Sequence, residues 1–554
     1  MKNYNFIMKD LSILIAGRAG DGIDKSSLII GEILARLGYR IYIYRDYPSI
    51  IRGGHTFSII RCSENKIAAH EDAIDVLLAL NQDSIDLHKS RLSAKSLIIY
   101  DSSTVKSDLG IGIPIGEIIK EAKAIDLMRN SCIVGAMCKS IGIEKNILEK
   151  ILRENITKEL DINLKVAFLG FDRSEEFIKV EKIDQKILPV ITGNEAIGQG
   201  LIKGGMKTYI AYPMTPVSGV LHYLAGVSEK FSLNVIHPEN EIAVMLMAMG
   251  FSYAGTRVAV GSSGGGFCLM TEGLSFSGMA ELPVVVLLGQ RPGPSTGLPT
   301  YTGQTELNFA LAAGQGEFTR LVLAPGDSEE AYYWSALSMR LAWKYQIPAI
   351  ILCDKTLNEG TYSFDIDLAG KITGPEPLLW DKSGEYKRYK NTKNGISPLA
   401  FPGDKGTVVK INSYEHDEAG ITTEDKDLTV AMQDKRLRKA GYLLSELEQY
   451  ETVKVYGEKN ASTAILCWGS NKGVCVEVGN KLGLRVVQPV VFSPFPLKQL
   501  KDALKGVKKI ICVENNATGQ LADLVKFHGI NVDDRVLKYD GRPFTPGELW
   551  KILI

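Results

Sequence analysis

Residues 281–300, ELPVVVLLGQRPGPSTGLPT, join a short apolar run to a loop rich in Pro, Gly, Ser and Thr. Such a run, apolar throughout and strand-length, is typical of a parallel strand covered by helices on both faces. Comparable runs recur between segments with helical spacing, such as IPAIILCD at 347–354 and KKIICVEN at 508–515. The pattern predicts an α/β protein whose domains are three-layered around parallel sheets. The other predicted strands are LSILIAG, SLIIYD, LKVAFLG, MKTYIAYP, TRVAVGSSGGG and STAILCWGS.

The chain has 554 residues, which favours roughly three or four domains of 100 to 200 residues. A polar stretch, DRSEEFIKVEKIDQK, closes the first block, and a second polar region follows the middle block and finishes in a charged helix, MQDKRLRKAGYLLSELEQY. The last block has its own alternation of strands and helices. These shifts in composition predict domains at 1–185, 190–365 and 459–554, with 366–458 as a connecting segment.

Charge and hydropathy exclude several classes of protein. Lys plus Arg and Asp plus Glu number 64 each, so the formal net charge is zero, which argues against nucleic acid as the main partner. No stretch reaches the roughly 18 uncharged apolar residues that a membrane helix needs. The first apolar run passes straight into a glycine turn without a small-residue cleavage site, so we expect a cytoplasmic protein that does not use a membrane.

Eight cysteines lie at 62, 132, 138, 268, 353, 467, 475 and 512. None forms a CxxC pair, and most lie inside apolar segments, where cysteine behaves as a small hydrophobic residue. We expect reduced structural thiols, no metal site and no iron–sulfur cluster ligated by this chain.

Two loops of the first block contain glycines and charged residues. The loop GRAGDGIDKSS, 17–27, matches neither GxGxxG nor a Walker motif, so an anion held on backbone N–H groups and a plain tight turn both stay open. The loop RDYPSIIRGGH places Arg45, Arg52 and His55 around a Gly-Gly pair. A ligand edge and a subunit edge are equally open interpretations of that loop.

The middle block holds three candidate residues. In AYPMTPVSG, two prolines fix the backbone around Thr215, a positioned hydroxyl. In HPENEIAVMLMAMG, Glu239 suits a solvated position at a helix start, whereas Glu241 precedes a wholly apolar stretch and is expected to be buried. In RPGPSTG the prolines leave Arg291 few conformations, and a preorganised guanidinium suits a planar carboxylate, from a ligand or from the protein itself.

The motifs YPMTP, ENE, GSSGGGFCLMTEG and QRPGPSTGLPT, in this order, resemble the α subunit of the 2-oxoacid:ferredoxin oxidoreductases. The first block looks like the γ domain of that family fused ahead of the α chain, and IICVENNATGQL through KYDGRPFTPGEL is similar to its transketolase C-terminal-like domain. The resemblance covers nearly the whole chain. It implies a thiamine-diphosphate enzyme that oxidatively decarboxylates a 2-oxoacid to acyl-CoA and CO2 and reduces ferredoxin.

The resemblance also implies that this chain carries half of an active site. The α chain of the family supplies the pyrimidine-binding domain, at 190–365 here, and a separate β subunit carries the diphosphate-binding domain, Mg²⁺ and an iron–sulfur cluster. The implied partners are therefore a β subunit, in an αβ or (αβ)2 complex, with ferredoxin, CoA and a 2-oxoacid. Thiamine diphosphate is implied to be shared between the two subunits.

Residue roles follow from matching positions in the family motifs. Glu241 matches the glutamate that hydrogen-bonds the aminopyrimidine nitrogen, and Thr215 and Arg291 match residues that hold the substrate carboxylate. Further implied contacts to the cofactor are Pro213, Ser263 and Gly264, and further implied contacts to the substrate are Ser295 and Thr296.

The chain departs from the family pattern at three places. Pro216, Val217 and Ser218 replace PSS, GRAGDG replaces GGQG, and Gln315, Gly316 and Glu317 stand where HGE is expected. 2-Oxoglutarate is the favoured substrate, and pyruvate, branched-chain and aryl 2-oxoacids stay open. Two other classes are a carboligase or decarboxylase using the same cofactor, against which the missing diphosphate motif argues, and a non-catalytic assembly subunit, against which the retained site residues argue.

Overall fold

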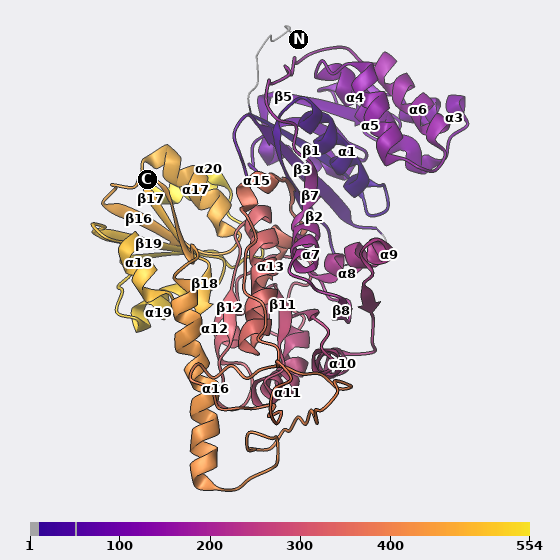
Figure 1. Cartoon of the computed structure of the whole chain (residues 1–554). Coiled ribbons are helices and arrows are strands. Elements are labelled where there is room, and N and C mark those ends of the chain that lie inside the picture. The colour runs from indigo at the N-terminus through magenta and orange to yellow at the C-terminus, as the bar shows by residue number, and fades with distance from the viewer. Residues whose placement is uncertain (1–9, 50–52) are drawn as a thin grey trace. The chain divides into compact units, whose positions relative to one another are not determined.

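The computed structural model describes residues 10–49 and 53–554. They form two compact units, drawn in Figure 1. The first contains the residues described up to Ile191 together with Gly360–Asp365 and Thr545–Ile554, and the second contains Thr192–Glu359 and Ile366–Phe544. Three sheets flanked by helices confirm the predicted α/β class.

The first unit contains an eight-stranded sheet in the order β6-β5-β4-β1-β3-β2-β14-β7. The pairs β1–β4, β4–β5 and β5–β6 are parallel, as predicted, but β3 runs antiparallel to both of its neighbours, β1 and β2. The sheet is mixed because the connection between β2 and β3 is too short to hold a crossover helix. The strands are β1 Asp10–Arg18, β2 Arg40–Asp46, β3 His55–Ser63, β4 Ile74–Ala79, β5 Leu92–Asp101, β6 Ile111–Ile113, β7 Val190–Thr192 and β14 Thr361–Ser363; the helices are α1 Ile23–Arg36, α2 Gln82–Asp86, α3 Ile115–Ala122, α4 Arg129–Ser140, α5 Lys145–Asn155, α6 Leu160–Asp172 and α20 Pro546–Leu553, with the 3₁₀ turns η1 Lys89–Arg91 and η2 Asp126–Met128.

The run LKVAFLG, 164–170, was predicted to be a strand, and that prediction is wrong because the run lies in α6. Its buried positions, Asn163, Leu164, Val166, Ala167 and Gly170, follow helical spacing. The run is largely apolar because α6 packs against α3, α4 and α5, whereas Lys165 within it is exposed (Figure 1).

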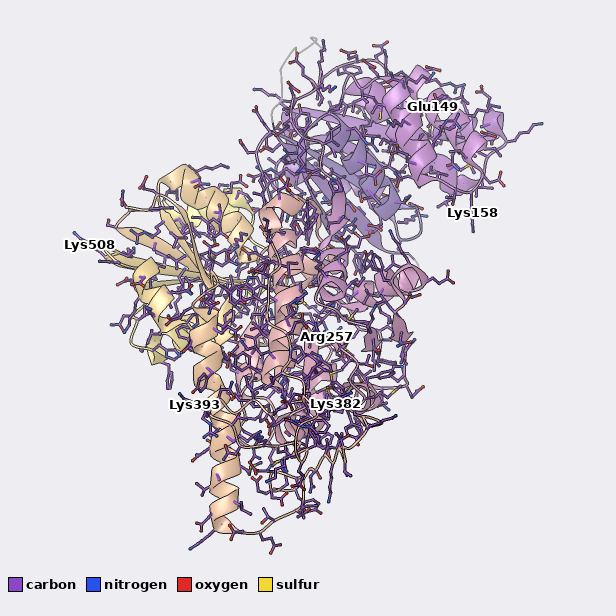
Figure 2. All side chains as sticks on the ribbon, viewed as in Figure 1. Glu149, Lys158, Arg257, Lys382, Lys393 and Lys508 are labelled. Atoms are coloured by element: carbon purple, nitrogen blue, oxygen red, sulfur yellow. The ribbon has the colours of Figure 1, made fainter. Side chains whose placement is uncertain are left out.

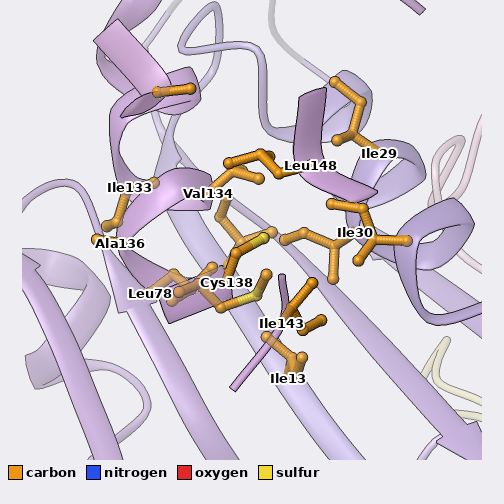
Figure 3. Packing of buried hydrophobic residues seen from close by; sticks show 14 of the residues in the cluster. Ile13, Ile29, Ile30, Leu78, Ile133, Val134, Ala136, Cys138, Ile143 and Leu148 are labelled. Carbon is orange, nitrogen blue, oxygen red and sulfur yellow. The ribbon is translucent and has the colours of Figure 1, made fainter. Parts of the chain in front are cut away.

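The core of the first unit is packed between the sheet and these helices. Figure 3 shows Ile13 of β1 and Leu78 of β4 beneath Cys138 of α4, with Ile30 of α1 beside them. All four side chains are fully buried. Apolar burial on this scale is the main favourable contribution to folding of such a layer.

The second unit begins with a seven-stranded sheet in the order β18-β12-β13-β11-β10-β8-β9. All its pairs are parallel except β12–β18. The quoted run VVVLLGQ is β11, buried along its whole length, which confirms the prediction of a covered parallel strand. The strands are β8 Thr208–Ala211, β9 Asn234–Ile236, β10 Val258–Ser263, β11 Val284–Gln290, β12 Leu321–Leu323, β13 Pro348–Asp354 and β18 Val491–Ser493; the helices are α7 Gly193–Lys203, α8 Ser218–Gly226, α9 Ser228–Phe231, α10 Glu241–Tyr253, α11 Gly264–Ala280, α12 Leu307–Ala312, α13 Ser328–Tyr345, α14 Lys355–Glu359 and α15 Ile366–Ala369.

A five-stranded sheet, in the order β15-β17-β16-β19-β20, follows the long helix α16, Lys426–Leu447, in the same unit. The polar region before α16 is mostly irregular, as its composition predicts. Figure 2 shows Lys508, an exposed residue, projecting from the amino end of β19. The strands are β15 Val453–Gly457, β16 Thr463–Cys467, β17 Arg485–Pro489, β19 Lys509–Glu514 and β20 Asp534–Leu537; the helices are α17 Asn471–Leu482, α18 Leu497–Ala503 and α19 Gln520–Phe527.

All eight cysteines fall within the part of the chain that the structure describes, and all are free thiols. Seven are buried and Cys268 is exposed, so the prediction of unpaired cysteines is confirmed. Burial raises the pKa of Cys353 to about 12, which keeps this thiol protonated at neutral pH. Within residues 10–49 and 53–554, no helix combines the length and apolar character required to cross a bilayer.

Close packing of α4 on α6 depends on glycine. A Cβ atom on Gly135 would lie 2.0 Å from the carbonyl oxygen of Ala167, a distance that only backbone movement can relieve. Gly441, inside α16, has open space around it. We therefore expect Gly135→Ala to cost about 2 kcal/mol or more despite the better helix propensity of alanine. Thermal unfolding should show a lower midpoint for Gly135→Ala, whereas the matched variant Gly441→Ala should keep or slightly raise it; equal midpoints would contradict the packing argument.

Candidate functional site

Three neighbouring parallel strands of the second unit end at one edge of their sheet. Gly261 of β10 lies opposite Ala211 of β8 on one side and Leu287 of β11 on the other. The loops that follow these strands therefore emerge side by side, at the carboxyl edge where open α/β sheets bind ligands. The loops after β8 and β11 carry Thr215 and Arg291, and Ser263 is the last residue of β10.

Arg291 contacts the loop that contains Thr215. Its Nη1 donates a hydrogen bond to the backbone carbonyl oxygen of Thr215 over 3.2 Å. The two loops approach closely because Gly289 has no side chain: a Cβ there would lie 2.8 Å from Cδ of Pro216. Burial lowers the pKa of Arg291, and the charge of Glu306 acts in the opposite direction. The guanidinium is thus anchored by a neutral acceptor and keeps donors for another group.

Glu241 is the first residue of α10 and is 4% exposed, so its predicted burial is confirmed. Asn240 caps the helix, with its Oδ1 accepting from the N–H of Ala243 over 2.9 Å. Glu239 precedes the cap and is exposed, in agreement with the solvated position predicted for it. The hydroxyl of Ser262 donates to Oε1 of Glu241 over 3.5 Å, which places this carboxyl at the end of β10.

The other predicted contact residues lie around the same strand ends. Ser263, fully buried, donates through its hydroxyl to the sulfur of Met214, beside the half-buried Pro213. Gly264 begins α11. Ser295 and Thr296 are exposed in the loop after Arg291, with the backbone of Ser295 3.9 Å from the position of a Cβ on Gly265. The structure therefore brings the predicted residues to one sheet edge, and their roles stay a prediction.

Gln304 holds the loop after β11 at its far end, and sequence reasoning missed it. The side chain is fully buried; its Nε2 donates to the carbonyl oxygen of Trp468 over 2.8 Å, and its Oε1 accepts from Asn471 Nδ2 over 2.9 Å and from the N–H of Asn515 over 3.0 Å. Its own backbone N–H donates to the carbonyl oxygen of Asn515 over 2.7 Å. The loop is stiff because of these contacts as well as its prolines.

Glu306 is a second residue that sequence reasoning missed. It is 8% exposed and lies over the first turn of α11, where a Cβ on Gly264 would come within 2.7 Å of its Oε1. Thr305 donates through its hydroxyl to the same oxygen over 2.7 Å. Burial raises the pKa of Glu306 to about 7, although Thr305 and Arg291 act to lower it. A carboxylate placed just before an apolar helix, in the sequence TELNFA, was the available signal.

The glycine turn of the first unit is closed by its own residues. Oδ2 of Asp21 accepts from the N–H of Arg18 over 2.7 Å, and Gly22 is left-handed with φ 75° at the start of α1. This geometry supports the tight-turn interpretation. Arg18 and Asp21, with Arg129, also border a cavity of about 280 Å³ at the strand ends.

The second loop of that unit, RDYPSIIRGGH, is described in part. Arg45 donates to Oγ1 of Thr361 over 2.7 Å and pairs with Asp24. His55 shares a hydrogen bond between ring nitrogens, Nε2 to Nε2, with His88 over 2.8 Å. Arg52 lies outside the described residues. Across residues 10–49 and 53–554, no group of three or more His, Cys, Asp or Glu side chains is arranged to hold a metal ion.

Comparison with protein families gives two matches. Residues 199–434 match the model "Pyruvate flavodoxin/ferredoxin oxidoreductase, thiamine diP-bdg", and residues 12–173 match "Pyruvate ferredoxin/flavodoxin oxidoreductase". The first range contains every site residue described above in the second unit. The fold and these matches define a subunit of a thiamine-diphosphate-dependent 2-oxoacid oxidoreductase.

Relatives that align over nearly the whole chain identify the family more narrowly. A 2-oxoacid:ferredoxin oxidoreductase subunit alpha from Sulfolobus sp is 32% identical over 98% of this chain and 96% of its own length, and the 2-oxoglutarate oxidoreductase subunit KorA of Mycobacterium tuberculosis is 25% identical over 99% and 91%. A solved 2-oxoglutarate:ferredoxin oxidoreductase from Magnetococcus marinus, with 2-oxoglutarate, coenzyme A and succinyl-CoA bound, is 30% identical with a TM-score of 0.89 over 99% of both chains. The chain belongs to the family of 2-oxoacid:ferredoxin oxidoreductase α subunits.

The first turn of α11 determines where Glu241 lies. A Cβ atom on Gly266 would come within 2.4 Å of Oε1 of Glu241 and 2.0 Å of Oγ of Ser262. Gly266→Ala should therefore displace the Glu241 carboxyl and weaken thiamine diphosphate binding by at least about tenfold, or ~1.4 kcal/mol, with little loss of helix stability. Titration of the cofactor into the assembled enzyme measures this effect.

Gly441, inside α16 with open space around it, provides the control variant Gly441→Ala. This change adds the same methyl group to a helix that does not carry Glu241. Equal cofactor affinity in the two variants would contradict the predicted contact between Glu241 and the cofactor.

Proposed function

We propose that this chain is the fused γ–α subunit of a CoA-dependent 2-oxoglutarate:ferredoxin oxidoreductase, which converts 2-oxoglutarate to succinyl-CoA and CO2 and passes two electrons to ferredoxin. The observation that carries the proposal is Arg291, held against the carbonyl of Thr215 on the same sheet edge as the buried Glu241. We assign the γ domain to 1–185, the pyrimidine-binding domain to 190–365 and the transketolase C-terminal-like domain to 459–554, with 366–458 connecting them.

Support for 2-oxoglutarate comes from the relatives. The Mycobacterium tuberculosis protein is named a 2-oxoglutarate oxidoreductase subunit, and the Magnetococcus marinus structure contains 2-oxoglutarate, coenzyme A and succinyl-CoA. The relative from Sulfolobus sp carries the broader name 2-oxoacid:ferredoxin oxidoreductase. Pyruvate, branched-chain and aryl 2-oxoacids are therefore alternative outcomes of the test below.

The site residues fit the pyrimidine half of thiamine diphosphate. The buried Glu241 presents an oxygen beside the glycine turn of α11, where it can hold a proton on a ring nitrogen of the aminopyrimidine. When bound, thiamine diphosphate supplies the carbanion nucleophile and the electron sink of the reaction. Pro213, Ser263 and Gly264 border the same turn and are proposed to contact the cofactor.

Arg291 and Thr215 are proposed to hold the substrate carboxylate, with Ser295 and Thr296 closing over it from the exposed part of the loop. A guanidinium already fixed by the Thr215 carbonyl gives up little conformational freedom when a carboxylate binds. Because the hydrogen bond from Nη1 points to a neutral acceptor, the arginine keeps its full charge for the ligand.

The proposal requires a β subunit that carries the diphosphate-binding half, Mg²⁺ and an iron–sulfur cluster. Helix α10, which begins at Glu241, is apolar on both faces: Val244 and Met245 are buried, whereas Ile242 and Leu246 are 46% and 51% exposed. Leu246 contacts α11, and the two helices lie beside each other in Figure 1. A helix that is apolar all round is normally buried, so this face beside the half-site fits the β subunit.

The function is tested by co-expressing this chain with a β subunit and measuring viologen reduction with CoA and a panel of 2-oxoacids. CoA-dependent reduction with 2-oxoglutarate is expected. Viologen reduction with a different 2-oxoacid, and none with 2-oxoglutarate, would rule out 2-oxoglutarate as the substrate but would still support CoA-dependent oxidation of a 2-oxoacid. An assembled complex that contains thiamine diphosphate and an iron–sulfur cluster but reduces nothing would favour a non-catalytic assembly subunit.

Removing the guanidinium should affect substrate binding and the chemical step together. Arg291→Ala is expected to raise KM for the 2-oxoacid and to lower kcat/KM. The fall in kcat/KM should correspond to about 2–4 kcal/mol of lost transition-state stabilisation, the cost of a lost charge-assisted contact. Steady-state kinetics with saturating CoA measures both constants.

Arg153→Ala, which removes an exposed arginine paired with Glu149 in the first unit, is the control and should leave both constants unchanged. Wild-type kinetics in Arg291→Ala would remove this residue from the substrate site.

A further inference from the structure

Glu306 has an unused hydrogen-bonding atom inside the site. Its Oε1 accepts from the Thr305 hydroxyl, but Oε2 is buried and has no hydrogen-bond partner among residues 10–49 and 53–554. An unpaired buried carboxyl oxygen costs stability, so a side chain of this kind needs a reason to be there.

Glu306 and Arg291 are connected through Thr305. The Thr305 hydroxyl lies 2.7 Å from Oε1 of Glu306 and 3.1 Å from the carbonyl oxygen of Arg291, so one side chain fixes both neighbours. The two charges influence each other's pKa, yet within the described part of the chain they form no ion pair. The guanidinium therefore lies within electrostatic reach of a carboxyl that it does not bind.

Two further residues that contact Glu306 are uncharged. Gln290, at the end of β11, accepts from the Glu306 N–H through Oε1 over 3.3 Å, and Gly264 of α11 lies against its carboxyl. Within the described residues, the charge that acts on the pKa of Glu306 is that of Arg291. The state of the Glu306 carboxyl and the availability of Arg291 are thus coupled.

We propose that Glu306 is a positioning residue that competes with the substrate carboxylate for Arg291: when ionised it draws the guanidinium toward itself, and when protonated it releases the guanidinium to the substrate. This inference rests on the proposed role of Arg291 in binding the substrate carboxylate. It adds that Glu306 sets the fraction of enzyme molecules in which the Arg291 guanidinium is available to the substrate. The competition is electrostatic, because both carboxylates seek the same donors.

The direction of the pH dependence follows from the charge states. Burial raises the pKa of Glu306 to about 7, so the carboxyl is neutral below that pH and ionised above it. Substrate binding to Arg291 is then favoured below pH 7 and weakens as the pH rises. Because one proton is linked to binding, KM for the 2-oxoacid should increase by up to about tenfold per pH unit above pH 7.

The experiment measures KM for the 2-oxoacid in the viologen-reduction assay. It uses the assembled enzyme and its active 2-oxoacid substrate, at saturating CoA, between pH 6 and 8.5. Wild-type enzyme should show the rise in KM. Glu306→Gln, which keeps the shape of the side chain but cannot ionise, should show a flat KM equal to or below the wild-type value at high pH. Glu306→Asp should restore the rise, because it restores a titrating carboxyl.

Glu424→Gln is the matched control, since it removes an exposed carboxylate from the segment before α16 and should retain the wild-type profile. A purely structural role for Glu306 would lower the thermal midpoint and kcat/KM of Glu306→Gln while leaving the slope of KM against pH in place, and would overturn the proposal.

A flat wild-type KM would overturn the proposal on its own, even if the variants failed to assemble. A wild-type complex that is inactive with every 2-oxoacid would reject the proposed function together with this inference. An active complex in which KM does not depend on pH would reject the role of Glu306 alone.

Discussion

The buried amide of Gln304 is the contact on which the geometry of the site depends. It joins the loop that carries Arg291 to Trp468, Asn471 and Asn515 of the five-stranded sheet region. Every polar atom of its side chain is used, so removing one partner would leave buried donors or acceptors unpaired. The loop after β11 is consequently fixed at both ends, by the strand before it and by Gln304 beyond it. Prolines within the loop narrow its conformations, but it is this amide that fixes where the loop lies.

A second buried polar cluster fixes the opposite end of α11. Glu281, just after that helix, accepts from Lys435 over 2.6 Å and pairs with Lys439, both on α16. Burial would raise the pKa of Glu281, but the two ammonium groups hold it well below its usual range; burial lowers the pKa of Lys439 to about 7. Such clusters contribute more to a unique geometry than to net stability. Because the first turn of α11 borders Glu241, the connecting segment affects the site through the position of this helix.

Much of this arrangement was predictable from the sequence, and the exceptions have two causes. Short apolar runs ending in glycine gave the parallel strands of the second unit, and Arg291 was singled out because two prolines follow it. LKVAFLG was assigned wrongly because, apart from Lys165, the run is as apolar as a buried strand, and periodicity cannot separate a helix from a strand over seven residues. Gln304 was missed because its partners lie far along the chain, and Glu306 was missed because the burial of its carboxyl depends on the glycine turn that packs against it. Local signals therefore predict elements and loops, whereas burial of a polar side chain depends on tertiary packing.

Among residues 10–49 and 53–554, Arg291 has no ion-pair partner, which is unfavourable for the isolated chain. A guanidinium that is partly removed from water loses hydration, and a direct ion pair with Glu306 would recover some of that loss. The structure instead supplies one neutral carbonyl, from Thr215, and within the described residues Oε2 of Glu306 has no hydrogen-bond partner. Strain of this kind persists only where the surroundings determine the geometry more strongly than the local preference does. Gln304 and the close contact of Gly289 with Pro216 supply that constraint. The same contacts therefore lower the stability of the isolated chain and hold Arg291 ready to bind a carboxylate.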